Sequence, residues 1–197
     1  MSCIYEVSFR SSHCFSFLLS GVLAFCGSLL IKTEVQAQFA ERILQQGNDI
    51  ANNGDCIAAS KLYTVAIKLD PQLSRSYFNR ANRNHYSFPN KGRCIWPKDL
   101  ESVLADYSKA IELEPFNTEY LQKRGHFRAE MKMYGEAISD YTRAIEIDPT
   151  WYHFLSRGET KIEMGDREGG CADFRMMSDS GIPAVQKKFI YTLAPNC

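Results

Sequence analysis

The sequence predicts an all-α fold built from stacked helical hairpins, and three observations support this prediction. The segment Asp106–Pro115 (DYSKAIELEP) recurs at Asp140–Pro149 (DYTRAIEIDP), with an offset of 34 residues at every position. A third and earlier copy spans Leu62–Pro71. Each copy is rich in helix-forming residues and ends at a proline, which disfavours helix in the residue before it. Helices that recur at a fixed spacing and stop at prolines indicate a repeat architecture.

The first 37 residues differ in kind from the rest of the chain. Arg10 leads into an apolar run from Phe15 to Ile31, and Val35-Gln36-Ala37 places small residues where a signal peptidase reads them. We therefore expect residues 1–37 to be a signal peptide that is cleaved after Ala37, and the mature protein to be exported.

Two alternatives remain for this leader. It could be retained as an N-terminal membrane anchor, because its 17 apolar residues are at the lower limit for crossing a bilayer. It could also mark a lipoprotein with Cys26 as the modified residue, although Phe25 is too large for the position before such a cysteine.

The charge balance argues against a polynucleotide partner. Lys plus Arg and Asp plus Glu each number 23. Such a chain lacks the cationic field on which binding to nucleic acid depends, so we expect no nucleic-acid partner.

The 34-residue period, with small, aromatic and proline residues at fixed offsets, resembles the tetratricopeptide repeat. The resemblance extends from about Ala40 to Leu193 and implies a right-handed α-α superhelix, or solenoid. The units that it implies are about 40–73, 74–117, 118–150 and a degenerate one at 151–181. The last unit is degenerate because Met177 replaces its final small residue and no proline closes it.

Each unit has core positions with a physical reason of their own. Small residues allow the two helices of a hairpin to approach closely, and aromatic residues fill the space between hairpins. These core positions are Gly47, Ala59, Tyr63, Ala66, Tyr107, Ala110, Gly125, Ala137, Tyr141, Ala144, Gly158 and Phe174.

Two segments depart from the repeat. The interval from Tyr63 to Tyr107 is 44 residues, so ten extra residues have entered the second unit, and 86–98 is predicted as a long loop with Cys94 and Trp96. Residues 182–197 are predicted as a C-terminal capping helix and tail, because their apolar residues recur at helical spacing.

The predicted mature chain keeps four cysteines, namely Cys56, Cys94, Cys171 and Cys197. Turns within the hairpins lie along one edge of such a stack, which places the 86–98 loop beside Cys56. In an oxidising compartment we expect the pairs Cys56–Cys94 and Cys171–Cys197. Four free thiols are the alternative.

The resemblance also implies a concave groove, lined by the first helix of each hairpin, that binds a segment of another protein. The predicted groove residues are Asn48, Arg75, Phe78, Asn79, Asn82, Gln122, Lys123, His126 and Tyr152. For Phe78 and Tyr152 the alternative is packing between hairpins.

The best-known ligand mode of the family is a clamp of two asparagines and three basic residues around a terminal carboxylate. Asn48, Asn79 and Lys123 match three of its positions, but Leu44 and Glu119 stand where lysines are required. A terminal carboxylate is therefore not the expected ligand.

No catalytic or metal-binding pattern is present in the sequence. It has no His-Glu-x-x-His, no Cys-x-x-Cys and no phosphate-binding Gly-rich loop. We expect no catalytic residue, no metal and no cofactor; contact between His126 and Ser139 in a pocket would favour a hydrolase instead.

The expected function is a non-enzymatic scaffold for protein–protein interaction. If the leader is retained, the alternative is a membrane-tethered assembly factor. The combination of leader, repeats and cysteines resembles bacterial exported proteins, which implies the periplasm or another extracytoplasmic compartment.

Overall fold

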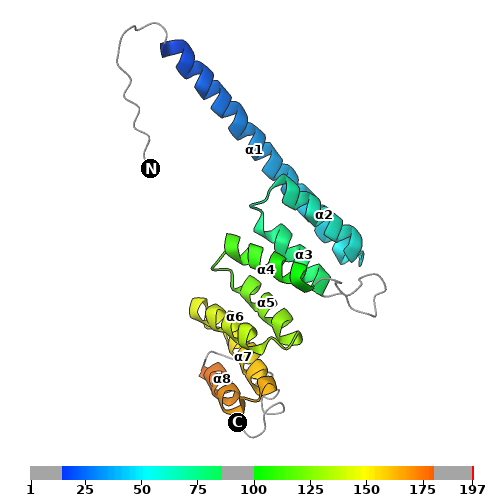
Figure 1. Cartoon of the computed structure of the whole chain (residues 1–197), viewed down its shortest axis with the longest axis vertical. Coiled ribbons are helices and arrows are strands. Elements are labelled where there is room, and N and C mark those ends of the chain that lie inside the picture. The colour runs from blue at the N-terminus through cyan, green and yellow to red at the C-terminus, as the bar shows by residue number, and fades with distance from the viewer. Residues whose placement is uncertain (1–14, 86–99, 180–196) are drawn as a thin grey trace.

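The computed structural model describes residues 15–85, 100–179 and 197. These residues form eight helices and no strand (Figure 1). The helices are α1 (Phe15–Asn52), α2 (Cys56–Leu69), α3 (Ser74–His85), α4 (Leu100–Leu113), α5 (Thr118–Glu130), α6 (Tyr134–Ile147), α7 (Trp151–Met164) and α8 (Arg167–Asp179). The predicted 86–98 loop and capping helix lie outside the described residues.

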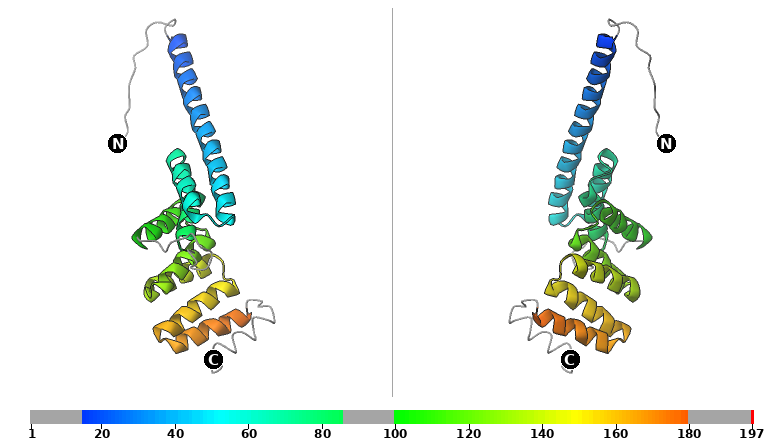
Figure 2. Two further views of the ribbon diagram at one scale, coloured as in Figure 1. Left: turned by 90° about the vertical axis from the view of Figure 1, so that its right-hand side faces the viewer. Right: turned by 90° about the vertical axis from the view of Figure 1, so that its left-hand side faces the viewer.

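Consecutive helices pair into hairpins, α1 with α2, α3 with α4, α5 with α6 and α7 with α8. The hairpins follow one another along the long axis of the molecule (Figures 1 and 2). The prediction of an all-α helical solenoid is confirmed. The fourth hairpin forms although its sequence is the most degenerate.

The first helix is longer than the others. Its N-terminal part projects beyond α2 and the rest of the stack, and α1 runs unbroken through Ala37 (Figure 1). Within the described part of the chain, no helix is both long and apolar enough to cross a membrane. Cleavage after Ala37 stays a prediction.

Helix ends follow local chemistry. Asp55 caps α2 by accepting a hydrogen bond from the Ala58 amide at 3.0 Å, and Asn117 caps α5 in the same way. Gly165 ends α7 in the left-handed conformation, with φ of 98°, which glycine adopts without a side-chain clash.

Each of three hairpins packs an aromatic ring directly against a glycine. An added Cβ would lie 2.6 Å from the Tyr63 ring at Gly47 and 2.7 Å from the Tyr141 ring at Gly125. Gly158 is related to Phe174 in the same way, also at 2.7 Å. Glycine is needed at these places because the ring occupies the space of a side chain. The second hairpin has the fully buried Ala81 instead.

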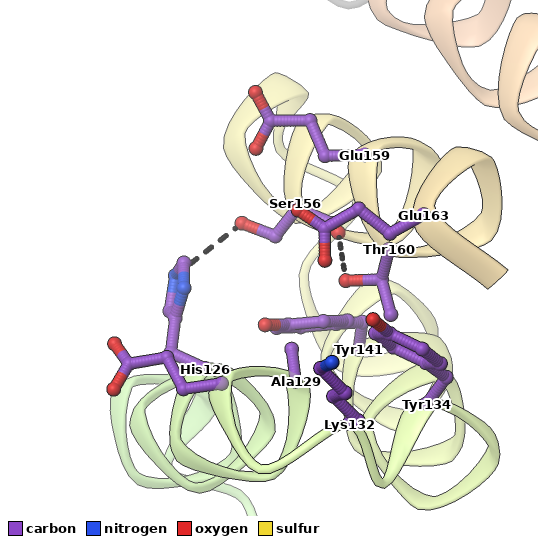
Figure 3. Close-up of a pocket in the computed structure, with 10 residues that line it drawn as sticks. His126, Ala129, Lys132, Tyr134, Tyr141, Ser156, Glu159, Thr160 and Glu163 are labelled. Atoms are coloured by element: carbon purple, nitrogen blue, oxygen red, sulfur yellow. Dashed lines mark hydrogen bonds between the residues drawn. The ribbon is translucent and has the colours of Figure 1, made fainter.

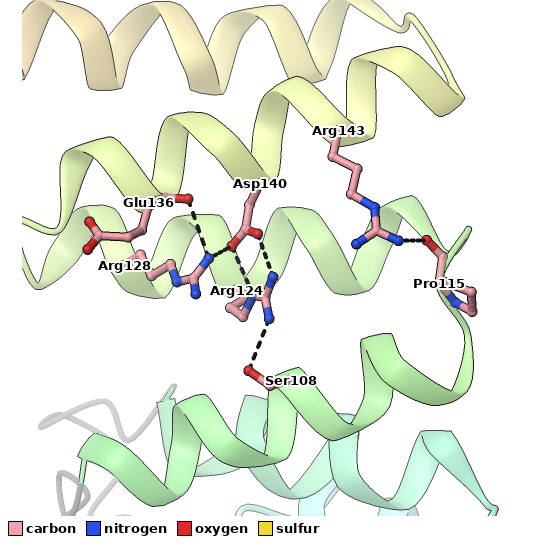
Figure 4. A network of polar contacts seen from close by, with 7 residues as sticks. All are labelled: Ser108, Pro115, Arg124, Arg128, Glu136, Asp140 and Arg143. Atoms are coloured by element: carbon pink, nitrogen blue, oxygen red, sulfur yellow. Dashed lines mark hydrogen bonds and ion pairs between the residues drawn. The ribbon is translucent and has the colours of Figure 1, made fainter.

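A repeated polar contact, which we call the clasp, joins neighbouring hairpins. Arg124 on α5 donates two hydrogen bonds to Asp140 on α6, at 2.6 and 3.0 Å, and one to Ser108 on α4, at 3.0 Å (Figure 4). The other two clasps are Arg80 with Asp106 and Thr64, and Arg157 with Asp173 and Thr142. Each clasp fixes both helices of one hairpin against the second helix of the hairpin before it.

The first hairpin has no clasp of its own. Gln46 and Leu62 stand in it where the arginine and aspartate of the other hairpins stand. Its Thr64 nevertheless accepts from Arg80, so the first hairpin is held by the clasp of the second.

Candidate binding groove

The first helices of the hairpins form one continuous layer. Contacts join α1 to α3, α3 to α5 and α5 to α7. Seven of the nine predicted groove residues have exposed or half-buried side chains on these helices. They are Asn48, Arg75, Asn79, Asn82, Lys123, His126 and Tyr152.

The other two predicted groove residues, Phe78 and Gln122, are packing residues, and this part of the prediction is corrected. Phe78 is only 6% exposed and stacks on Tyr120 of the next hairpin, with ring centroids 4.4 Å apart. Gln122 is 2% exposed, and its amide donates to Ser156 of the next hairpin at 3.1 Å. Both side chains fill the junction between successive first helices, so they are not available to a partner.

In the N-terminal half of the groove, polar groups are bonded to one another. Asn48 Oδ1 accepts from Asn79 Nδ2 at 2.7 Å and from the Tyr63 hydroxyl at 3.0 Å. Arg75 pairs with Glu41 at 2.5 Å. These contacts connect α1 to α3 and place the two clamp-like asparagines in contact with each other.

The C-terminal half of the groove contains a pocket of about 280 Å³ between α5 and α7 (Figure 3). Its lining residues are His126, Ala129, Glu130, Lys132, Tyr134, Tyr141, Ser156, Glu159, Thr160 and Glu163. His126 lies at one side of it, where its ring meets the Tyr141 ring edge to face at 5.6 Å. Of the predicted groove residues, only His126 lines this pocket.

Burial and like charge act together on the acidic side of the pocket. Burial, and then the neighbouring carboxylate of Glu163, raise the pKa of Glu159 above its ordinary value. Burial is also the main reason that the pKa of Tyr141 is raised, and the charge of Glu159 adds to it. The pocket therefore disfavours negative charge.

Comparison with known proteins agrees with this geometry. Residues 118–150 match the family model described as "Tetratricopeptide repeat", and no curated protein matches the chain. The chain is a tetratricopeptide-repeat protein. This confirms the family resemblance found in the sequence.

Solved structures resemble this tetratricopeptide-repeat protein at low identity. A crystal structure of MamA is 19% identical with a TM-score of 0.63, over 77% of this chain and 81% of that one. The first tetratricopeptide repeat of Spaghetti (RPAP3), bound to the HSP90 peptide SRMEEVD, is 22% identical with a TM-score of 0.57, over 66% and 95%. MamA from Desulfovibrio magneticus RS-1 is 16% identical with a TM-score of 0.61, over 71% and 74%. At these identities the likeness establishes the fold.

The histidine of the pocket lies beside a serine, but not the one considered from the sequence. Ser139 is exposed on α6, whereas Ser156 Oγ lies 3.4 Å from His126 Nε2. The Ser156 hydroxyl donates to the Tyr152 carbonyl at 3.2 Å and accepts from Gln122, and its side chain is buried. A serine nucleophile must instead give its proton to the base at hydrogen-bond distance, so this geometry does not favour Ser156 as a nucleophile.

Metal and cysteine chemistry were also considered in the sequence. In the ranges that the structure describes, no three His, Cys, Asp or Glu side chains are grouped to hold a metal ion. Cys171 and Cys197 have Cα atoms 5.1 Å apart, a separation that a disulfide spans without backbone movement. Cys94 lies outside the described residues, so the Cys56–Cys94 pair stays a prediction.

Proposed function

We propose that this tetratricopeptide-repeat protein is a non-enzymatic scaffold that binds a segment of a partner protein along the groove of α1, α3, α5 and α7. The observation that carries the proposal is the contrast between the two halves of that groove. Around α5 and α7 the layer opens into a pocket, whereas around α1 and α3 its polar groups bond to one another. A partner segment would therefore make its main contacts near His126 and Tyr152.

The surface around the pocket suits a peptide chain. Tyr152 is 39% exposed beside the pocket, and aromatic side chains of this kind supply much of the contact energy of protein interfaces. The RPAP3 repeat with its bound peptide supports a peptide as the class of ligand. Leu44 is buried and Glu119 is acidic, which argues against a terminal carboxylate as the group recognised.

Affinity capture from the cells that make the protein tests this proposal. The double substitution Lys123→Ala and Tyr152→Ala removes a cation and an aromatic ring from the groove. The control, Lys68→Ala and Val65→Ala, removes a cation and an exposed apolar side chain from α2. We expect the groove variant to lose the partner and the control to retain it; equal capture by both variants would contradict the proposal.

A second candidate function is a membrane-tethered assembly factor, in which the leader is retained. The observation that favours it is the unbroken course of α1, which joins the apolar run to the first hairpin without a turn. Sequencing the N-terminus of the protein from cell fractions separates the candidates. Gln38 in the extracytoplasmic soluble fraction supports export with cleavage, and an intact leader in the membrane fraction supports the tether.

A further inference from the structure

We propose that the pocket between α5 and α7 binds a cationic side chain, lysine or arginine, of the partner segment. This inference rests on the proposed groove function and specifies the chemistry of its ligand.

The size of the pocket suits one side chain. At about 280 Å³ it is just below the range of about 300–1,000 Å³ that is typical of small-molecule sites. Its walls come from α5, α6, α7 and the α5–α6 turn, and Figure 3 shows their side chains converging on one space. A single long side chain can enter such a space while the rest of a peptide lies along the groove.

The charge of the lining selects the sign of the ligand. Glu130, Glu159 and Glu163 line the pocket, and Lys132 is its one lining residue with a permanent positive charge. With His126 neutral, three negative charges and one positive charge leave a net charge of −2. An anionic group would be repelled.

Two of these glutamates differ from the carboxylates in the clasps. Asp106, Asp140 and Asp173 are each paired with an arginine. Among residues 15–85, 100–179 and 197, no ion pair joins Glu159 or Glu163 to a cation. Glu159 is nevertheless half-buried, where an unpaired charge is costly.

The spacing of the two glutamates adds to the cost. Glu159 and Glu163 are four residues apart on α7 and share a face, which places their side chains side by side, and like charges so placed repel. A cation between them would relieve both the repulsion and the burial of unpaired charge.

The remaining lining suits the stem of a lysine or arginine. Tyr134 and Tyr141 present aromatic rings below Glu163 (Figure 3). Alkyl stems pack on such rings, and a guanidinium or ammonium group interacts favourably with their faces. This combination of rings and carboxylates favours a side-chain cation over a bare metal ion.

The test uses the full-length protein and a displayed library of random 12-residue peptides. The library is selected on wild type, on the variant Glu159→Gln/Glu163→Gln, and on the control Glu146→Gln/Glu168→Gln. The control makes the same change of charge at exposed positions outside the pocket. A selected peptide is then compared with a version that has citrulline for arginine, or norleucine for lysine.

We expect lysine or arginine to be enriched at one position of the peptides selected on wild type and control. The neutral peptide should bind about tenfold more weakly to both, as expected for loss of a charged hydrogen-bonded contact. On the pocket variant the two peptides should bind equally. Thermal unfolding checks that this variant is folded.

The outcomes separate the two proposals. Peptides that bind wild type but not Lys123→Ala/Tyr152→Ala, and that show no loss with citrulline or norleucine, overturn the cation site and leave the groove proposal standing. Peptides whose cation preference persists in the pocket variant also overturn the cation site. If no peptide is selected that depends on the groove, both proposals are overturned.

Discussion

Replacing Asp140 by alanine should be among the most destabilising single changes in the chain. The Asp140 side chain is 5% exposed and accepts from Arg124 at 2.6 and 3.0 Å and from Arg128 at 2.6 Å. The two arginine side chains are only 14% and 19% exposed. Alanine at this position would leave both cations partly buried without their carboxylate (Figure 4).

The size of the effect follows from what remains rather than from what is lost. Summing three charged hydrogen bonds at about 1.5–3 kcal/mol each would overestimate it, because burying the carboxylate also costs free energy. Removing one partner of a buried ion pair typically costs about 3–5 kcal/mol, and we expect Asp140→Ala in that range. Since domains have total stabilities of about 5–15 kcal/mol, this is a large fraction.

Urea unfolding, followed by circular dichroism, measures the change. The control is Glu146→Ala, which removes an exposed carboxylate from the same helix and should alter stability by less than about 0.5 kcal/mol. A loss below about 1 kcal/mol for Asp140→Ala would refute the account of the clasp. Adding Arg124→Met to Asp140→Ala should restore part of the loss, because one unpaired cation is then removed.

Three further predictions concern packing, charge and the cysteines. Gly158→Ala should lower the thermal midpoint, because its Cβ would lie 2.7 Å from an aromatic ring, whereas Gly135→Ala, with nothing within 4 Å, should raise it through better helix propensity, by about 0.5–1 kcal/mol; a gain at both sites would contradict the packing account. Burial and a like charge raise the pKa of Glu159 in the folded state, so this group weakens the fold as pH rises from its ordinary value of 4.5 through the folded value. Glu159→Gln should therefore stabilise the protein at pH 7 and have little effect below pH 4.5, and urea titrations showing the same gain at both would be inconsistent with this sign. Non-reducing mass mapping should find Cys171 joined to Cys197, and breaking that bond should cost about 3 kcal/mol by the loop-closure relation; recovery of both as alkylated thiols would contradict the pairing.

The repeat was predictable because its determinants are local in sequence. Prolines stop each second helix, and glycine and aromatic positions recur at fixed offsets within each hairpin. A pair such as Gly125 and Tyr141 can therefore be recognised without knowing how the hairpins stack. The hairpin formed by α7 and α8 shows that the pattern tolerates the loss of its closing small residue and proline.

The groove was predicted less well because a helix in a stack has several neighbours. Helical spacing placed Phe78 and Gln122 on the groove-facing side, but that side also borders the next first helix. Their side chains turn into this junction, where Tyr120 and Ser156 receive them. Periodicity alone cannot divide one face of a helix between solvent and a neighbour.

The clasp had a visible signal that was not used. Arg124 precedes Asp140 by 16 residues, and Arg157 precedes Asp173 by the same interval. The insertion in the second unit lengthens the interval from Arg80 to Asp106 to 26 residues, which hides the period there. The pocket had no comparable signal, because its walls come from three helices and a turn.

The measurement that tests the central claim most directly is site-specific photo-crosslinking in the cells that make the protein. A photoreactive p-benzoylphenylalanine replaces Tyr152 in the groove or, as the control, Val65 on the exposed side of α2. The account predicts a defined crosslinked partner from position 152 and none from position 65. The same partner from both positions, or a partner from position 65 alone, would contradict the claim that the groove is the binding surface.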